Sequence, residues 1–433
     1  MFKRDVEPLL VELLTDFRIV YLTGPRQSGK TTIAKRIADN LGMKYVTLDD
    51  QAILATINND PHGYIRSLSG QKIVLDEFQY AEGLVPAIKE ASDTLAEGER
   101  GKFLLTGSTD IFRSAKTREA LPGHLARVEL YPLSLTEIKA TSFNLIDYLS
   151  EGEFRPIPTH FLARDEIAKL LIYGGYPEVQ DKNRRSRQIW FRSYIEGRLL
   201  KDFENLYAAR GDYSSKLSSL VTRLAGLSGN LLKYASIAND LKLDDKLVKS
   251  YIEILELMFI VKRLPAYVKN AAKRTVIGMP KVQFVDTGLA CYLLGLRRIE
   301  SLLHSQFYGS LLETYLFMEC CKHMTWAEED VRLYHFRDKQ KNEVDLVLEK
   351  SNSRVIGVEV KASATIRVSD FKGLIKLADF AGQHFEKGII FYTGNEVLPF
   401  NLQGRQFHAI PLSILVKNEL KDMNFGDTLL NYP

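Results

Sequence analysis

The chain has 433 residues, enough for two to four domains of about 100–200 residues each. Hydrophobic residues make up 45% and charged residues 26% of it, so we expect globular cores, and a net charge of +4 is too small to indicate nucleic-acid binding by itself. The three cysteines form no CxxC pair, which disfavours a zinc site and indicates a reducing compartment. No run of about 18 apolar residues occurs, so we predict a cytoplasmic protein with no membrane partner.

The first chemical motif follows a short apolar stretch. Residues 18–23, RIVYLT, predict a strand, and apolar positions at Ile33, Ile37 and Leu41 predict a helix. Between them lies GPRQSGKTT, and strand, glycine-rich loop and helix in this order are the context of a phosphate-binding P-loop. Backbone N–H groups of such a loop wrap the phosphates, and the helix N-terminus adds positive potential. We therefore expect ATP to bind Gly24, Pro25, Arg26, Gln27, Ser28, Gly29, Lys30, Thr31 and Thr32.

Two side chains of the loop and two acidic residues further along predict hydrolysis. Lys30 is expected to contact the β- and γ-phosphates as a catalytic residue, and the Thr31 hydroxyl to bind Mg²⁺. The run Ile73–Leu75 predicts a strand buried in a parallel sheet, with Asp76 and Glu77 at its ligand-binding end. Asp76 would hold Mg²⁺ through water, and Glu77 would polarise the attacking water. The alternative is that both acids only cap a strand end.

A third predicted strand, KFLLTGSTD at 102–110, ends in hydroxyl side chains. Ser108 is our candidate for a contact with the γ-phosphate. Ordinary turn chemistry is the competing explanation for a serine at this place.

The middle of the chain has a different pattern. Residues 139–165 have the mixed composition of a linker, and 165–275 are mostly helical in spacing. Within them YASIANDLKL, a turn at Asp244-Asp245, the helix KLVKSYIEILELM and the strand FIVKRLPAY predict a helix-turn-helix with a wing. Its lysines could contact DNA phosphates, but glutamates on the same helix fit a solvated face equally well.

The stretch EVDLVLEKSNSRVIGVEVK, residues 343–361, predicts two strands that carry acidic residues. Glu359 and Lys361 project to one face of the second strand, Asp345 lies on the first, and a preceding helix at 309–322, which we expect to be amphipathic, carries Glu313. Buried carboxylates are costly without a cation, and such a set suits Mg²⁺ or Mn²⁺. We expect Glu313, Asp345 and Glu359 to bind the metal and Lys361 to act on water or phosphate. The alternatives are an exposed ion pair of Glu359 with Lys361, or a binding platform that cleaves nothing.

Taken together, these segments resemble a family of prokaryotic AAA-superfamily ATPases with a C-terminal domain of unknown function. The likeness covers nearly the whole chain through GPRQSGKTT, IVLDEFQ, LLTGST, LPGHLARVELYPLSLTEI, IYGGYPEV, KVQFVDTGLACYLLG, GSLLETYLF and EVDLVL…GVEVKAS. The order of Glu313, Asp345 and Glu359-x-Lys361 resembles the PD-(D/E)xK nucleases. The resemblance implies an α/β chain with an AAA-type P-loop domain at 1–140, a linker, helical and winged-helix region at 141–275, and a nuclease-like α/β domain at 276–433.

One departure from the family concerns an arginine. Many members read LAGR where this chain reads LPGH, ending at His124, so Arg113, Arg118 and Arg127 are the nearby candidates for an arginine that acts on a neighbouring subunit. Because AAA-type sites are commonly shared between subunits, the resemblance includes a ring or dimer among the expected assemblies.

Two functions remain open from the sequence. The first is a Mg²⁺-dependent ATPase that acts on DNA or RNA, with a C-terminal domain that cleaves phosphodiesters. The second is an ATP-driven switch that binds a protein partner and has a non-catalytic C-terminal domain.

Overall fold

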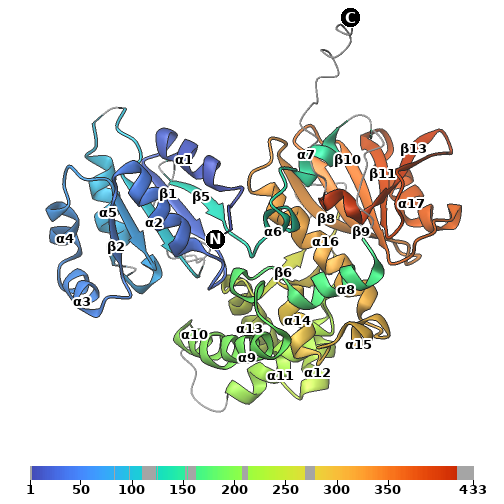
Figure 1. The fold of residues 1–433 in the computed structure, drawn as a ribbon, viewed down its shortest axis with the longest axis horizontal. Coiled ribbons are helices and arrows are strands. Elements are labelled where there is room, and N and C mark those ends of the chain that lie inside the picture. Colours follow the sequence, from blue (N-terminus) through green and yellow to red (C-terminus); the bar gives the residue numbers. More distant parts are fainter. Residues whose placement is uncertain are drawn as a thin grey trace, which may run out of the picture.

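The computed structural model describes residues 2–81, 83–96, 98–109, 123, 125–151, 154, 162–206, 213–268 and 278–416. Figure 1 shows the N-terminal part at the left, a mostly helical middle part below, and a C-terminal part with a second sheet at the right. The chain is therefore of the α/β class, as predicted, with a parallel sheet and a mixed sheet.

A five-stranded parallel sheet forms the N-terminal part. Its strand order is β2-β3-β4-β1-β5. Because side chains alternate along a strand, Ile19 and Tyr21 of β1 pack into one core and Val20 and Leu22 into another. The three central strands β3, β4 and β1 are thus buried on both faces, which explains their largely apolar sequences. The elements are α1 (Glu7–Asp16), β1 (Ile19–Thr23), α2 (Lys30–Leu41), β2 (Lys44–Thr47), α3 (Gln51–Asn59), α4 (Pro61–Ser67), β3 (Ile73–Asp76), α5 (Leu84–Asp93), β4 (Phe103–Gly107) and β5 (Leu125–Glu129).

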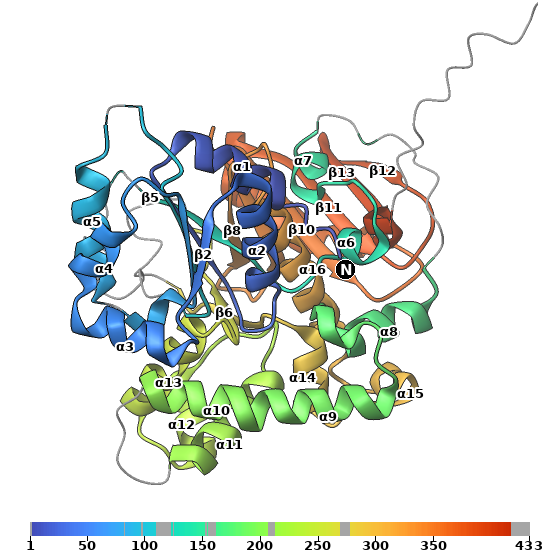
Figure 2. The same ribbon diagram turned by 60° about the vertical axis from the view of Figure 1, so that its left-hand side comes forward.

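The middle part is built from helices and one antiparallel strand pair, β6 with β7. Figure 2 shows α9 and α10 running in line beneath the two sheets, and a π-helical turn, Ile195–Leu199, joins them. The helix-turn-helix segment forms α12 and α13 and leads into β6, while the winged-helix assignment stays a prediction. The elements are α6 (Leu135–Lys139), α7 (Leu145–Ser150), α8 (Arg164–Tyr173), α9 (Arg184–Tyr194), α10 (Leu200–Leu206), α11 (Tyr213–Ala225), α12 (Tyr234–Leu241), α13 (Asp245–Leu257), β6 (Val261–Leu264), β7 (Lys281–Phe284), α14 (Thr287–Leu293) and α15 (Ile299–Leu303).

The C-terminal part is a six-stranded mixed sheet with the order β12-β13-β11-β10-β9-β8. Its inner strands are parallel, and β9 and β12 run antiparallel to their neighbours. Leu346 and Val358 share a core with α16, whereas Val347 and Val355 share one with α17, so the two helices cover opposite faces. The elements are α16 (Tyr308–Met324), β8 (Val331–Arg337), β9 (Glu343–Lys350), β10 (Val355–Lys361), α17 (Lys372–Ala381), β11 (Phe385–Tyr392), β12 (Leu398–Leu402) and β13 (Arg405–Pro411). Short 3₁₀ helices include Phe78–Ala81, Pro177–Val179, Val368–Phe371, Gly382–His384 and Leu412–Val416.

One hydrophobic core joins the middle and C-terminal parts. Its buried residues, which lie between Tyr131 and Val416, come from both sides of the predicted boundary at 275. The segment expected to be a linker contributes to this core, because α7 lies within it and packs against α16. The division at 140 and 275 stays a prediction. In the described part of the chain, no helix is both long and apolar enough to cross a membrane.

Candidate functional site

The predicted phosphate loop lies between β1 and α2 and lines a cavity of about 600 Å³. Gln27 and Gly29 both have left-handed backbone angles, with φ of 61° and 100°, so the chain winds tightly before α2 begins at Lys30. Residues Arg26 to Thr32 border the cavity together with Glu77 and with Pro177 of the middle region. The parallel sheet therefore presents the loop and the β3 acid to one space, as expected of the carboxyl ends of parallel strands.

Lys30 is folded back onto its own loop. Its Nζ donates hydrogen bonds to the carbonyl oxygens of Gly24 (2.9 Å) and Pro25 (2.8 Å). Burial lowers the pKa of Lys30 to about 8, although the carboxylates of Glu77 and Asp76 partly offset this. An ammonium group with only neutral acceptors in a buried site has a strong electrostatic preference for an anion such as phosphate.

The two predicted magnesium ligands of the loop region lie side by side. Thr31 Oγ1 donates to Asp76 Oδ2 at 2.9 Å, and the Tyr45 hydroxyl also donates to Asp76 Oδ2, at 2.6 Å. Thr106 Oγ1 donates to the other Asp76 oxygen. A hydroxyl and a carboxylate at this place are the donors that a hydrated Mg²⁺ prefers, so the residues fit that ion. Tyr45 was missed because it lies on β2, outside both motifs, and two helices separate it from Asp76 along the chain.

Glu77 and Ser108, the predicted water-polarising acid and phosphate contact, are also neighbours. Ser108 Oγ donates to Glu77 Oε2 at 3.2 Å. The Gln79 amide donates both to Glu77 and to Ser108 Oγ, the latter at 2.9 Å, and so joins the two side chains. Glu77 has a left-handed φ of 57°, and its N–H donates to Thr106 Oγ1 at 3.1 Å. Gln79 was not predicted, although its place two residues after Glu77 is a usable signal.

Arg26 faces the middle region. Its guanidinium binds the carboxylate of Asp202 on α10 and donates to the Tyr80 hydroxyl at 2.7 Å. The residue predicted to hold nucleotide therefore also ties the loop to α10. Among the candidates for a trans-acting arginine, Arg113 and Arg118 lie outside the described residues, and Arg127 on β5 pairs with Glu129 at 2.6 Å.

The C-terminal acidic residues come from three elements and lie close together. Lys281 Nζ on β7 is 3.4 Å from Asp345 Oδ1 and 3.7 Å from Glu313 Oε2. Lys361 Nζ is 3.3 Å from Glu359 Oε2. Burial, followed by the charge of Asp345, raises the pKa of Glu313 to about 8 and that of Glu359 well above its ordinary value. Lys281 was missed, because a single lysine in an apolar strand gives no sign of its partners.

The fit of a metal ion differs between the two sites. Among the residues that the structure describes, no group of three or more His, Cys, Asp or Glu side chains is arranged to hold a metal ion. At the C-terminal acids, the Lys281 ammonium lies where a cation between Glu313 and Asp345 would lie. The carboxylate set is of the right chemical type but is not placed for a metal, so this metal site stays a prediction.

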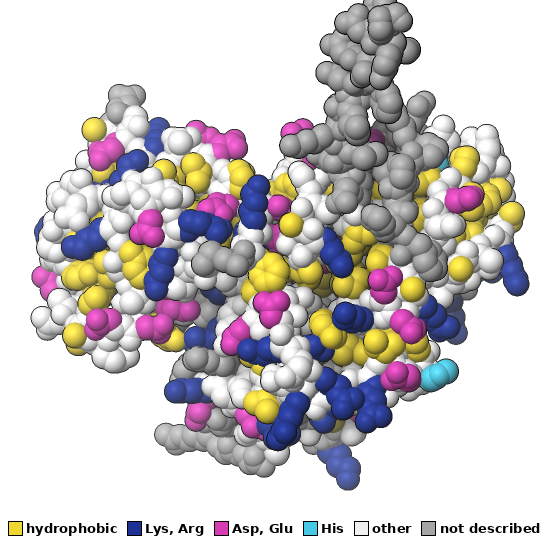
Figure 3. All heavy atoms as spheres, viewed as in Figure 1, with side chains coloured by type: hydrophobic (Ala, Val, Ile, Leu, Met, Phe, Trp, Pro, Cys, Tyr) yellow, Lys and Arg dark blue, Asp and Glu magenta, His cyan; other side chains and the backbone are white. Residues whose placement is uncertain are grey.

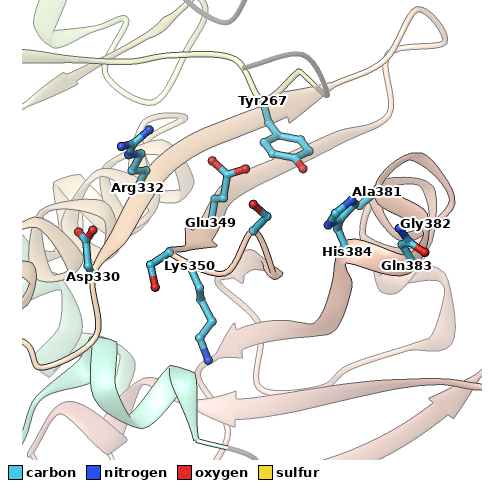
Figure 4. Close-up of a pocket in the computed structure, with 11 residues that line it drawn as sticks. Tyr267, Asp330, Arg332, Glu349, Lys350, Ala381, Gly382, Gln383 and His384 are labelled. Carbon is cyan, nitrogen blue, oxygen red and sulfur yellow. The ribbon is translucent and has the colours of Figure 1, made fainter. Parts of the chain in front are cut away.

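A second cavity, of about 740 Å³, lies at the far end of β9 and contains none of the predicted site residues. Figure 4 shows Glu349 pointing toward Tyr267 and Lys350 pointing away, with His384 on the opposite wall. Its wall mixes acidic, basic and hydroxyl side chains, so it indicates no single class of ligand. The surface in Figure 3 is likewise mixed in charge, with basic and acidic side chains interspersed.

Comparison with known proteins assigns the first domain to a class. Residues 16–139 match the family described as "AAA domain". Residues 164–300 and 308–415 match two different domains of unknown function, DUF8612 and DUF4143. Together with the loop, Asp76 and Glu77 in one site, the first match identifies an AAA-type P-loop ATPase domain in this chain.

Relatives of the whole chain carry no named activity. The uncharacterized protein Rv2008c of Mycobacterium tuberculosis is 26% identical over 369 residues, which cover 85% of this chain and 75% of that protein. The uncharacterized protein Mb2031c of Mycobacterium bovis matches over the same lengths with the same identity. The chain therefore resembles these proteins over most of its length.

Solved structures add little. The Walker-type ATPase PABY2304 of Pyrococcus abyssi is 15% identical with a TM-score of 0.42, and the match covers 68% of this chain and 96% of that one. AMPPCP-bound DnaA from Aquifex aeolicus is 14% identical with a TM-score of 0.27, covering 58% and 86%. These TM-scores are low, so the class rests on the AAA match and on the site geometry.

Proposed function

We propose that the chain binds ATP with Mg²⁺ at the P-loop and hydrolyses it to drive a conformational switch. The observation that carries this proposal is the Thr31 hydroxyl 2.9 Å from the Asp76 carboxylate, beside the buried Lys30. Lys30 would exchange its two carbonyl partners for phosphate oxygens, and Glu77 would orient the attacking water from the end of β3. Mg²⁺, when bound, would neutralise phosphate charge next to Thr31 and Asp76.

Two variants separate binding from turnover. Lys30→Ala is expected to abolish binding of a fluorescent ATP analogue, because the phosphates lose their only buried cation within the loop. Glu77→Gln is expected to bind the analogue with wild-type affinity and to slow phosphate release about a hundredfold or more, because the phosphate-binding loop is intact while the acid is lost. Unchanged affinity in the first variant, or wild-type turnover in the second, would reject the roles given to these residues.

The C-terminal part is proposed to bind a partner without cleaving it. What supports this is Lys281, whose ammonium lies close to both Glu313 and Asp345, where a divalent ion between these acids would lie. The partner is either nucleic acid or protein. The second candidate function is metal-dependent cleavage of nucleic acid, and it is favoured by the closeness of Lys361 to Glu359 in the same group of acids.

Cleavage assays decide between these candidates. We expect no Mn²⁺-dependent nicking of linear, branched or structured DNA or RNA by the wild-type protein. Asp345→Ala serves as the matched variant, since it removes the acid next to Lys281. Nicking by the wild type that disappears in Asp345→Ala would establish the second candidate instead.

A further inference from the structure

Arg4 connects the phosphate loop to two distant segments. The residue precedes α1 and is 6% exposed. Its Nη1 donates to the carbonyl oxygen of Ser28 at 2.6 Å, and its Nη2 donates to that of Tyr131 at 2.7 Å. Its Nε donates to Glu137 Oε1 at 2.8 Å. All three guanidinium nitrogens are therefore used, one of them on the loop itself.

The contact with Ser28 bears on phosphate binding. The Ser28 carbonyl and the Gly29 N–H belong to one planar peptide unit, in which they point in opposite directions. Fixing the carbonyl on Arg4 therefore fixes the direction of the Gly29 N–H, one of the groups that a P-loop turns toward phosphate. A Cβ at Gly29 would lie 3.6 Å from Arg4 Nη1, so the guanidinium lies directly against the loop.

Glu137, which Arg4 contacts, lies in a segment that is hydrogen-bonded to the C-terminal part. Glu137 caps α6, where its second oxygen accepts from the Ser134 N–H at 2.9 Å. The N–H of Leu135, the first residue of α6, donates to Glu319 Oε2 on α16 at 2.9 Å. Lys322 of α16 donates to the Leu133 carbonyl at 2.9 Å.

These contacts are buried and charged. Glu319 is fully buried, and Lys322 and Glu137 are each 9% exposed. Charge-assisted hydrogen bonds in such surroundings are strong and directional, and loss of one partner leaves the other unpaired. These contacts join the phosphate loop to α16, which carries Glu313 six residues before Glu319.

We propose that Arg4 is a positioning residue of the nucleotide site, and that through Glu137 it links nucleotide occupancy to the contact between α6 and α16. This rests on the proposed binding of ATP to the loop. Because linkage is reciprocal, any effect of nucleotide on the α6–α16 contact requires an equal effect of that contact on nucleotide affinity.

The first experiment measures affinity for a fluorescent ATP analogue with Mg²⁺ in the full chain. Arg4→Gln is expected to weaken binding about tenfold, in line with one charged hydrogen bond. The matched control is Arg18→Gln, which removes an arginine whose Nη1 binds the Ser92 carbonyl at 2.8 Å in the same domain. Equal affinities of the two variants overturn the proposal. An absence of binding by the wild type rejects ATP binding itself and is a different outcome.

The second experiment separates positioning from mere support of the fold. In the wild type, saturating analogue is expected to change amide hydrogen exchange in α6. In Arg4→Gln saturated with analogue, this response is expected to disappear, whereas a purely structural role lowers protection equally with and without analogue. If Arg4→Gln does not fold, as judged by thermal unfolding, Glu137→Gln replaces it, because this variant keeps the contacts of Arg4 with Ser28 and Tyr131. A wild-type exchange response in Glu137→Gln then overturns the link to α16.

Discussion

At the scale of single residues, His335 shows how burial creates a dependence on pH. It lies on β8, is 2% exposed, and its Nε2–H donates to the Met279 carbonyl at 2.9 Å, since a carbonyl can only accept. Burial lowers its pKa from 6.5 to about 4. Below pH 6.5 His335 therefore becomes protonated in the unfolded chain, whereas in the folded chain it stays neutral until about pH 4. The free energy of unfolding consequently falls as the pH falls through this window.

His335→Gln is expected to reduce this acid sensitivity. Glutamine keeps an N–H donor for Met279 and has no proton to gain, so the loss of stability between about pH 7 and about pH 4 should shrink by up to about 3 kcal/mol. Urea unfolding at several pH values measures this loss of stability in the wild type and in the variant. The control is His384→Gln, at an exposed histidine. An acid sensitivity equal to that of the wild type in His335→Gln would show that His335 is not the group concerned.

The predicted residues of the nucleotide site share one property, which is that their signal is local. Lys30, Thr31, Asp76 and Glu77 stand at fixed places in short motifs whose physics is that of one loop or one strand end. Arg4, by contrast, acts on carbonyl groups 24 and 127 residues away, which leave no pattern in a single sequence. Lys281 escaped prediction for the same reason.

At the scale of elements, the turn between β1 and α2 depends on Gly24. A Cβ at this position would lie 2.1 Å from the carbonyl oxygen of Leu130. Leu130 is held there by its own N–H, which donates to Thr23 at 2.7 Å. The loop and the segment after β5 are thus packed backbone against backbone, and no side chain fits between them.

Gly24→Ala is expected to abolish binding of the ATP analogue, because the loop must move away from Leu130 to make room. Gly42→Ala at the end of α2 is the matched control. Gly42 also has a left-handed φ, of 63°, but has open space around it, so this change should cost about 1 kcal/mol of stability and leave binding intact. Wild-type affinity in Gly24→Ala would contradict the packing described here.

The strands and helices that we expected from periodicity are present in the structure, but their surroundings were not predicted. The strand expected at 18–23 is β1, and the helix expected at 309–322 is α16. We expected that helix to be amphipathic, yet it is buried along most of its length. It contacts α7 and α8 as well as β10, so it has little surface left for water. Burial by later segments of the chain cannot be read from the helix itself.

At the scale of the whole molecule, the distribution of cores sets the expected units of unfolding. The two cores around the parallel sheet use only residues from Val6 to Leu130. Among the described residues, the large core is made of residues from Tyr131 onward, and it unites the middle and C-terminal parts that composition separates. The boundary at 275 stays a prediction, and shared burial between the two segments could not be read from the sequence, because it is a property of the fold and not of either segment.

Calorimetry is therefore expected to show two unfolding transitions. Leu105 of β4 and Leu220 of α11 are both fully buried, the first in a parallel-sheet core and the second in the large core. Leu105→Ala should lower the temperature of only one transition, and Leu220→Ala that of only the other. Each substitution should lower the free energy of unfolding of its unit by about 2–5 kcal/mol, because each leaves a cavity in a separate core. An ATP analogue should raise the transition that Leu105→Ala lowers, since ligand stabilises the unit that binds it. A single transition lowered by both substitutions would mean that the Arg4 contacts and the segment after β5 join all parts into one cooperative unit.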